Sequence, residues 1–405
     1  GIIAEYNPFH NGHYYHMQKA KQEANADYCI AVISGNFTQR GDVSIVNKWA
    51  KAYMAICGGA DLVIELPTIY SVSSAENFAN GAIKILDSLK IVDSFAFGAE
   101  ANDLATLNNI ANVLNEEPKG YTNILNHELK KGISYPAARE NAIMMYLNDI
   151  KQYANILTGS NNILAIEYLK AIKKLKSKLN PIGIRREKVL YNDEIIIDDF
   201  ASATAIRKMI ATGQFSDIQK VMPKSSYALL ADELRKGHYV LDLSKFQKEI
   251  IYNLRKMSVE EIAQLVDVSE GLENAIKNAA NSSNNLVDFV NIVKSKRYTQ
   301  TRIQRILIYA LLGITNSKML AFKKAVPYAR VLGFNENGKQ LISQIAKKNK
   351  KVQIVTSVKK YMDESKNKVL KEMLETDILA TNVYTLGYEK DSWSNLDYTN
   401  KLVTM

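Results

Sequence analysis

Short apolar runs alternate with helical patterns through the first third of the chain, and this alternation limits the possible folds most. The runs are GIIAEY, YCIAVIS, DLVIELP and SFAFGAE, at residues 1–6, 28–34, 61–67 and 94–100. Between them, segments such as NKWAKAYMAICGGA and SAENFANGAIKILDSL carry apolar residues near the 3.6-residue helical period. Strands separated by helices form βαβ units with buried parallel strands. The sequence therefore predicts an α/β fold built on a Rossmann-like parallel sheet.

The strand pattern fades in the second half. A helix at 160–179 and a strand candidate, NPIGIRRE, at 180–187 continue the α/β pattern to about residue 215. After about residue 235 helical patterns such as KFQKEIIYNLRKM and TRIQRILIYALLGI dominate. A chain of 405 residues exceeds the size at which a single core usually keeps growing. We predict an α/β domain at 1–235 and a mainly helical, basic domain at 236–405.

The composition is that of an ordinary globular protein, with 47% hydrophobic and 23% charged residues. Two cysteines, Cys29 and Cys57, do not suggest a disulfide framework, and no signal peptide or membrane-spanning run is visible. We therefore expect a cytoplasmic protein that does not enter a membrane. Because residue 1 is Gly, we expect a few preceding residues to be missing. The net charge of +10 favours an anionic partner such as nucleic acid.

The segment NPFHNGH, residues 7–13, follows the first predicted strand. In doubly wound sheets, ligands bind where strands end and helices begin, because helix N-termini offer free N–H groups. Pro8 stiffens the exit from the strand, and Gly12 lets the backbone approach a phosphate closely. His10 and His13 lie one helical turn apart and can both donate to one oxyanion. An ordinary surface pair of histidines is the alternative interpretation.

A metal site is a further interpretation, since His10, His13 and His16 follow an H-x-x-H-x-x-H spacing. On a helix, His16 lies about 600° further round than His10, so three imidazoles would not converge well on one ion. Cysteine and carboxylate partners nearby are also missing. We therefore predict no protein-held metal.

A second cluster, ASATAIRKMI at 201–210, combines Ser202 and Thr204 with Arg207 three residues later. A hydroxyl and a guanidinium placed in this way can both reach one phosphate group. An ordinary capped helix is the alternative. The combination with NPFHNGH is what favours a nucleotide site.

These two clusters together resemble the nucleotidyltransferase superfamily. GIIAEYNPFHNGHYYHM, ISGNFTQRGDVSIVNKWAKA, GADLVIELP, FGAE, SNNILAIEYLKA, FASATAIRK and SKRYTQTRIQRIL more closely resemble the bacterial tRNA(Met) cytidine acetate ligase family. That resemblance implies an ATP-dependent ligase. Acetate would attack the α-phosphate of ATP to give acetyl-adenylate and pyrophosphate, and the acetyl group would pass to N4 of the wobble cytidine of elongator tRNA(Met).

The resemblance also implies roles for individual residues. His10 and His13 would be catalytic and stabilise charge on the leaving pyrophosphate. The expected ATP-binding residues are Asn7, Pro8, Phe9, His10, Gly12, His13, Gly98, Asn161, Asn162, Arg185, Arg186, Ser202, Thr204 and Arg207.

Two further segments remain open. Gln39, Arg40 and Asp42 in SGNFTQRGD would line the acetate or cytidine pocket, or form a plain glycine-bounded turn. Where the family is expected to carry Tyr-His-Asp, this chain has YND, so Asn192 replaces an imidazole.

The segment 289–362 contains one acidic residue, Glu336, against sixteen basic ones. Within it, a helical stripe made of Ile303, Ile306, Leu307, Ala310 and Leu311 would face the core and leave the arginines of that helix outside. Such a charge surplus fits RNA held by its backbone, whereas lysines on a solvated helix are the alternative at any single position. The expected tRNA contacts are Lys296, Arg297, Arg302 and Arg305.

The expected small ligands are ATP, accompanied by Mg²⁺, and acetate. Two rivals remain open: a nucleotidyltransferase that joins AMP or CMP to a small phosphorylated acceptor, and a noncatalytic RNA-binding protein. The sequence does not indicate an oligomeric state.

Overall fold

The computed structural model describes residues 1–100, 103–133, 135–149, 153, 156–157, 159–185, 199–295 and 297–405. Five parallel strands run in the order β3-β2-β1-β4-β5. Their bounds are β1 (Ile2–Ala4), β2 (Ile30–Ser34), β3 (Leu62–Leu66), β4 (Ser94–Ala99) and β5 (Asn180–Arg185). This order reverses direction between β1 and β4, which makes their carboxyl ends the switch point of the sheet. The predicted parallel sheet is confirmed, each predicted strand included.

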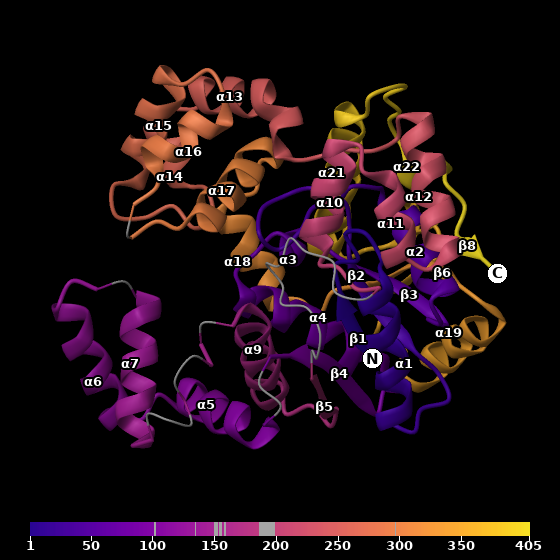
Figure 1. Ribbon diagram of the computed structural model, residues 1–405, viewed down its shortest axis with the longest axis horizontal. Coiled ribbons are helices and arrows are strands. Elements are labelled where there is room, and N and C mark those ends of the chain that lie inside the picture. Colours follow the sequence, from indigo (N-terminus) through magenta and orange to yellow (C-terminus); the bar gives the residue numbers. More distant parts are fainter. Residues whose placement is uncertain are drawn as a thin grey trace.

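Helices cover both faces of this sheet (Figure 1). One face packs against α1 (Asn11–Glu23) and α2 (Lys48–Cys57), and the other against α4 (Ala75–Leu89) and α9 (Ser160–Lys174). Successive strand residues point to opposite faces, so Ala31 and Ile33 join one core and Ile30 and Val32 the other. Both β2 and β3 are buried along their whole length, as their unbroken apolar runs predict.

Three strands from the second half join the same sheet, which the sequence patterns did not predict. They are β6 (Ala329–Phe334), β7 (Ile354–Val355) and β8 (Val403–Thr404). β6 pairs antiparallel with β3, and β7 and β8 pair with β6. The prediction that helices dominate after about residue 235 is therefore wrong for 329–404, where these three strands lie. The sheet crosses the predicted boundary, and the division into domains at 235 stays a prediction.

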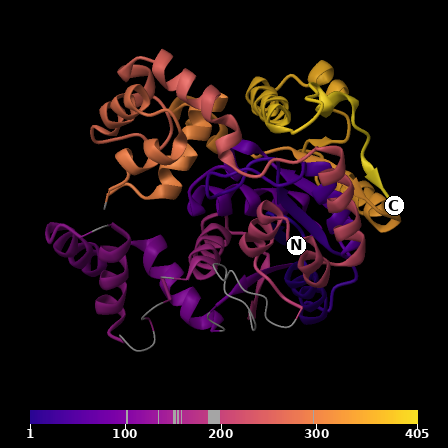
Figure 2. The same cartoon turned by 45° about the horizontal axis from the view of Figure 1, so that its top comes forward.

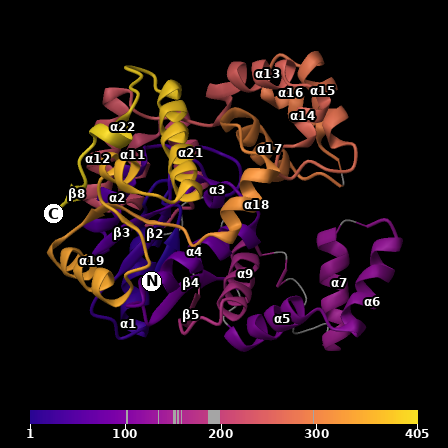
Figure 3. The same ribbon diagram turned by 180° about the vertical axis from the view of Figure 1, so that it is seen from behind.

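The other helices form groups around the sheet. In Figure 1 the helices α13–α17 lie at the upper left and α6 and α7 at the lower left. In Figure 2 the orange helical group and the yellow C-terminal helices both lie above the indigo part of the chain. Seen from behind, α4, α9 and α18 lie side by side (Figure 3). The bounds are α3 (Thr68–Ser71), α5 (Leu104–Glu116), α6 (Lys119–Lys130), α7 (Tyr135–Leu147), α10 (Ala203–Thr212), α11 (Phe215–Val221), α12 (Lys224–Lys236), η1 (Leu243–Phe246), α13 (Gln247–Lys256), α14 (Val259–Ala263), α15 (Leu272–Ser282), α16 (Leu286–Val293), α17 (Gln300–Leu312), α18 (Asn316–Lys324), α19 (Glu336–Lys348), α20 (Val358–Glu364), α21 (Lys368–Tyr384), η2 (Thr385–Gly387) and α22 (Leu396–Thr399).

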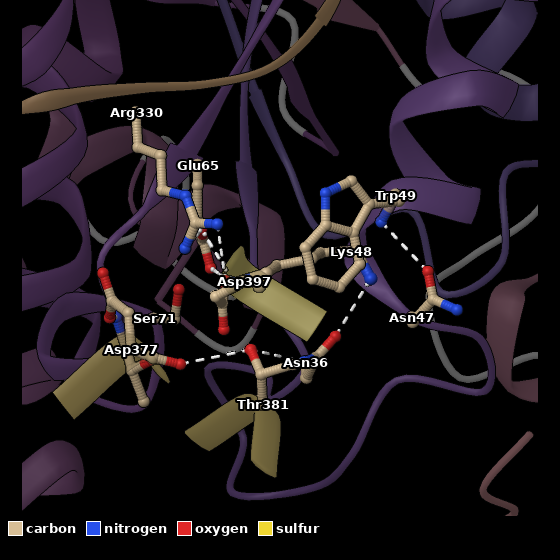
Figure 4. Close-up of polar contacts among 12 residues, drawn as sticks. Asn36, Asn47, Lys48, Trp49, Glu65, Ser71, Arg330, Asp377, Thr381 and Asp397 are labelled. Atoms are coloured by element: carbon tan, nitrogen blue, oxygen red, sulfur yellow. Dashed lines mark hydrogen bonds and ion pairs between the residues drawn. The ribbon is translucent and has the colours of Figure 1, made fainter. Parts of the chain in front are cut away.

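A buried ionic cluster joins the C-terminal helices to the sheet (Figure 4). Lys48 Nζ lies 2.9 Å from Glu65 Oε1 and 2.7 Å from Asp397 Oδ1. On β6, Arg330 Nη1 lies 3.1 Å from Glu65 Oε2, and Arg330 Nη2 lies 2.5 Å from Asp397 Oδ1. These side chains are at most 4% exposed. Removing one partner would leave an uncompensated buried charge, so the cluster fixes where α22 lies.

No helix among the described residues is both long and apolar enough to span a membrane.

Candidate functional site

A cavity of about 570 Å³ opens at the carboxyl ends of β1 and β4. Residues from α1, α9 and α10 line it, and so do Gln39 and Arg40 from the loop after β2. Thr301 and Arg305 of α17 close one side. The switch point of a doubly wound sheet is where such folds bind nucleotides. The helix of the basic segment thus borders the same cavity as the H-x-G-H motif.

The two predicted catalytic histidines lie face to face at the start of α1. His10 is the N-cap, and its Nδ1 accepts from the Gly12 N–H at 3.0 Å. His13 Nδ1 accepts from the His10 N–H at 3.3 Å. The ring centroids are 3.8 Å apart. Because both Nδ1 atoms accept, the hydrogen-bond pattern assigns the proton of each neutral ring to Nε2, which suits donation to an oxyanion.

Gly12 is required by the His10 ring. A Cβ at position 12 would lie 2.9 Å from His10 Cε1 and 3.0 Å from its Nδ1. Gly12 is predicted to let the backbone approach a phosphate. The structure shows a reason within the protein as well, because the His10 ring leaves no room for a side chain at position 12. The glycine therefore lets His10 cap α1 with its imidazole turned onto the helix.

Asn7 holds the strand end in place. Its Nδ2 donates to the Val43 carbonyl at 3.0 Å, and its Oδ1 accepts from the Ile45 N–H at 2.7 Å. The Asn7–Pro8 peptide is cis. The polar atoms of the Asn7 side chain are thus used inside the protein, although the residue lines the cavity.

Glu100, which sequence reasoning missed, ties the end of β4 to the start of α9. Its Oε2 accepts from the Asn162 N–H at 2.8 Å, and its Oε1 accepts from the Asn161 side chain at 2.6 Å. Asn162 Oδ1 in turn accepts from the Glu100 N–H at 3.0 Å. A carboxylate at a helix N-terminus is favourable. Asn161 lines the cavity, whereas Asn162, 3% exposed, is a positioning residue behind it.

The start of α10 brings Arg207 to the H-x-G-H segment. Ser202 is the N-cap and accepts from the Ala205 N–H at 3.0 Å. Arg207 donates to the Asn7 carbonyl at 2.9 Å and to Thr204 Oγ1 at 3.3 Å. Two clusters 200 residues apart in sequence therefore meet at one site. Arg207 lines the cavity, whereas Ser202 is buried as a cap.

The loop between β2 and α2 packs directly against α17. Gly41 has φ +79°, and a Cβ there would lie 2.4 Å from the Arg305 backbone nitrogen. Gln39 donates from its side chain to the Ser73 carbonyl at 2.8 Å. Asp42 does not line the cavity. It accepts from the Val43 and Leu243 N–H groups, and burial raises its pKa.

Lys51, also missed, fixes the ends of β1 and β2. Its Nζ donates to the carbonyls of Glu5, Ser34 and Gly35 at 3.1, 2.8 and 2.6 Å. Burial lowers the pKa of Lys51 to about 7, against the opposing pull of Glu5 and Glu65. An ammonium shared among strand-end carbonyls holds the floor of the cavity rigid.

The predicted ATP-binding residues fall into three groups. Those that line the cavity are Asn7, His10, Gly12, His13, Gly98, Asn161, Arg185 and Arg207. Those found outside its lining are Pro8, Phe9, Asn162, Ser202 and Thr204. Arg186 lies outside the described residues, as do Asn192 and Lys296. The cavity also contains residues that sequence reasoning missed, among them Glu5, Tyr6, Phe200 and Thr301.

The predicted tRNA-binding arginines are held by one loop. The apolar stripe of α17 faces the core as predicted. The two arginines of this helix, Arg302 and Arg305, are half-buried and bonded within the protein. Arg302 donates to the Asp267 carbonyl and to Ser269, and Arg305 pairs with the Asp267 carboxylate at 3.3 Å. Of the three described arginines, Arg297 is the exposed one, and it pairs with Glu270 at 3.2 Å. Arg330, counted among the sixteen basic residues, is buried in the ionic cluster and unavailable to RNA.

Among the described residues, no group of three or more His, Cys, Asp and Glu side chains could hold a metal ion. His16 lines the cavity, but it forms no such group with its neighbours.

The fold and the cavity define the class of protein as an α/β nucleotidyltransferase with an H-x-G-H site. A family model described as HIGH Nucleotidyl Transferase matches residues 1–398. A crystal structure of Thermotoga maritima TmcAL (apo, form I) is similar, with a TM-score of 0.95, 32% identity, and coverage of 100% of this chain and 99% of that one. Thermotoga maritima TmcAL bound with alpha-thio ATP has a TM-score of 0.92, 31% identity and the same coverage.

Curated relatives narrow the class. The tRNA(Met) cytidine acetate ligase of Thermoanaerobacter pseudethanolicus is 45% identical over 405 residues, covering 100% of this chain and 99% of the relative. That of Acetivibrio thermocellus is 43% identical over 413 residues with the same coverage. This chain belongs to the tRNA(Met) cytidine acetate ligase family.

Proposed function

We propose that this chain activates acetate with ATP and transfers the acetyl group to N4 of a cytidine in tRNA(Met), releasing AMP and pyrophosphate. The observation that carries the proposal is the single cavity that H-x-G-H residues and α17 line together. One side of it has the groups of an ATP site. The other side opens toward the basic segment of a chain whose relatives are named for tRNA(Met) and acetate.

Activation is needed because acetate has no viable leaving group for attack by a weakly nucleophilic amine. ATP would lie with its phosphates at the start of α1. His10 and His13 would donate to the pyrophosphate as charge develops, and Arg207, held at Asn7, would add a cation there. A rigid strand end and capped helices keep these donors aligned, which is the main contribution that such a site makes to rate.

Mg²⁺ is expected to accompany ATP. In the described part of the chain, no group of three or more His, Cys, Asp and Glu side chains could hold it. We therefore propose that any Mg²⁺ enters with its phosphate oxygens and water as ligands. None of the steps above depends on a protein-held ion.

Acetate-dependent exchange between ATP and pyrophosphate tests the proposal, run on the wild type and on His13→Ala. Exchange that requires acetate and falls by about 100-fold in the variant, the loss typical of one oxyanion donor, would support activation at this site. Transfer of labelled acetate to tRNA(Met) tests the second step.

The rival nucleotidyltransferase acting on a phosphorylated acceptor shares the H-x-G-H cavity but leaves the docking of α17 at that cavity without a purpose. Exchange that needs a phosphorylated acceptor and ignores acetate would favour it. A noncatalytic RNA-binding protein would bind tRNA without any exchange, and His10→Ala would not change its ATP affinity.

A further inference from the structure

A carboxylate stands at the junction between the two sides of the cavity. Glu5 directly follows β1, which lies between β4 and β2 in the sheet. Gly98 and Arg185 line the cavity on the β4–β5 side, and Gln39 and Arg305 line it on the other. Glu5 is therefore placed between the region expected to hold ATP and the region that faces the basic segment.

The Glu5 carboxylate is held by one of its two oxygens. Oε1 accepts from the Gln39 N–H at 2.7 Å, while the Glu5 carbonyl accepts from Lys51 at 3.1 Å. Within the described residues, no hydrogen bond or ion pair reaches the other oxygen, Oε2. The side chain is partly buried and lines the cavity. A fixed acceptor is thus presented to whatever occupies the junction.

We propose that Glu5 recognises the N4 amine of the acceptor cytosine and removes its proton during acetyl transfer. The inference rests on the proposed function and concerns its second step. A carboxylate is the side chain that accepts from cytosine N4, whereas uracil presents a carbonyl oxygen at the same position. Two acceptors facing each other repel, so Glu5 selects cytosine against uracil as well as serving the reaction.

The N4 lone pair forms a bond to the acetyl carbon, and the bond from that carbon to the AMP phosphate oxygen breaks, leaving its electron pair on AMP. One N4 proton passes to Glu5 Oε2. The carboxylate then releases the proton to solvent. The products are N4-acetylcytidine and AMP, and neither a redox partner nor an additional group is required.

The surroundings of Glu5 suit a splayed-out base. Tyr168 and Phe78 contribute aromatic carbons to the cavity wall, against which a base can pack. Burial, with the nearby Glu5 charge, raises the pKa of Tyr168, so its hydroxyl remains neutral. Arg40 lines the side through which RNA would enter and is suited to a flanking phosphate, whereas Arg305 beside it is already paired with Asp267.

Glu5→Gln separates recognition from a purely structural role. The Gln oxygen can still accept from the Gln39 N–H, so the loop should keep its position, but its amide would turn a donor toward the N4 amine. We expect acetyl transfer to tRNA to fall by about 100-fold or more, the usual contribution of a general base. Acetate-dependent pyrophosphate exchange and trapping of acetyl-adenylate by hydroxylamine should persist, because neither needs the cytosine.

A binding measurement gives a readout that does not depend on turnover. Wild type should bind a tRNA(Met) transcript with the target cytidine more tightly than one with uridine there, and Glu5→Gln should reverse that preference. Glu5→Asp, which keeps a carboxylate, should retain the wild-type preference. Glu5→Ala serves as the control for loss of the loop contact.

Three outcomes would overturn the inference: wild-type transfer by Glu5→Gln, loss of exchange together with transfer in that variant, or an unchanged cytidine preference. Absence of acetate-dependent exchange in the wild type would instead refute the proposed function itself.

Discussion

At the scale of single residues, the site depends on backbone groups that are placed by side chains rather than on exposed charges. His10 caps the N-terminus of α1. Both polar side-chain atoms of Asn7 form hydrogen bonds to the backbone of the 43–45 segment, and Lys51 donates to carbonyls at the strand ends. The groups that would touch ATP are therefore preorganised, and small changes behind them should affect activity.

Gly12→Ala tests this dependence on packing. The new Cβ would lie 2.9 Å from the His10 ring and push the imidazole away from the Gly12 N–H. We expect kcat for acetate-dependent exchange to fall toward the 100-fold or so lost with one oxyanion donor. Gly183→Ala is the matched control, because the nearest atom to its added Cβ is 3.9 Å away. Equal activity of the two variants would contradict a tightly packed His10.

Asp377 gives a pH dependence of stability. Burial and the nearby Glu65 charge raise its pKa to about 7, while its oxygens accept from the Thr68 N–H and the Tyr328 hydroxyl. The folded state then holds a proton between about pH 4 and pH 7 that the unfolded state has released, so this contribution to stability declines as the pH rises through that window. Asp377→Asn should keep the bond that its Oδ1 accepts from the Thr68 N–H, and its Nδ2 can donate to the Tyr328 hydroxyl oxygen in place of accepting from it.

Scanning calorimetry at pH 5 and pH 8 measures the effect. The gain in Tm of Asp377→Asn over wild type should be larger at pH 8 than at pH 5. The exposed Asp391→Asn should show no such difference. A gain that does not change with pH would show that Asp377 is ionised throughout.

At the scale of elements, the contact between the loop after β2 and α17 joins the two sides of the cavity. Arg305, Gln39 and Gly41 bring a helix of the second half within van der Waals distance of a loop from the first. Under the proposed function, the alignment of ATP and RNA would depend on a contact that neither segment makes by itself.

Gly41→Ala should separate these elements, since its Cβ would lie 2.4 Å from the Arg305 nitrogen. We expect kcat/KM for acetyl transfer to tRNA to fall by about tenfold or more, because misplacement by an ångström costs on the order of 100-fold. Gly313→Ala is the control, with φ +63° and open space around the added Cβ. If both variants lose transfer equally, backbone strain rather than the contact is responsible.

At the scale of the whole molecule, the second half completes the fold of the first. β6 pairs with the edge of β3. In the buried ionic cluster, Arg330 neutralises Glu65 and Asp397 neutralises Lys48. A sheet edge that is buried and apolar is a site for aggregation when uncovered.

A fragment of residues 1–235 should therefore fail to fold alone, although the predicted boundary lies there. It would expose the edge of β3 and remove Arg330 and Asp397, two of the four members of the buried ionic cluster. Proteolysis and circular dichroism would measure this, and co-expression with residues 236–405 should restore a protease-resistant product. A cooperatively folded fragment would show that the boundary marks an independent domain.

The sequence by itself determined the parallel strands, the helices between them and the two motif clusters, because periodicity and local spacing carry that information. The family also followed from these motifs. Glu5 stood out only as a charge inside GIIAEY. Tertiary structure alone decided that 329–404 joins the first sheet, that Arg330 is buried, and that α17 borders the cavity. These depend on contacts between residues far apart in the chain, which local patterns do not encode.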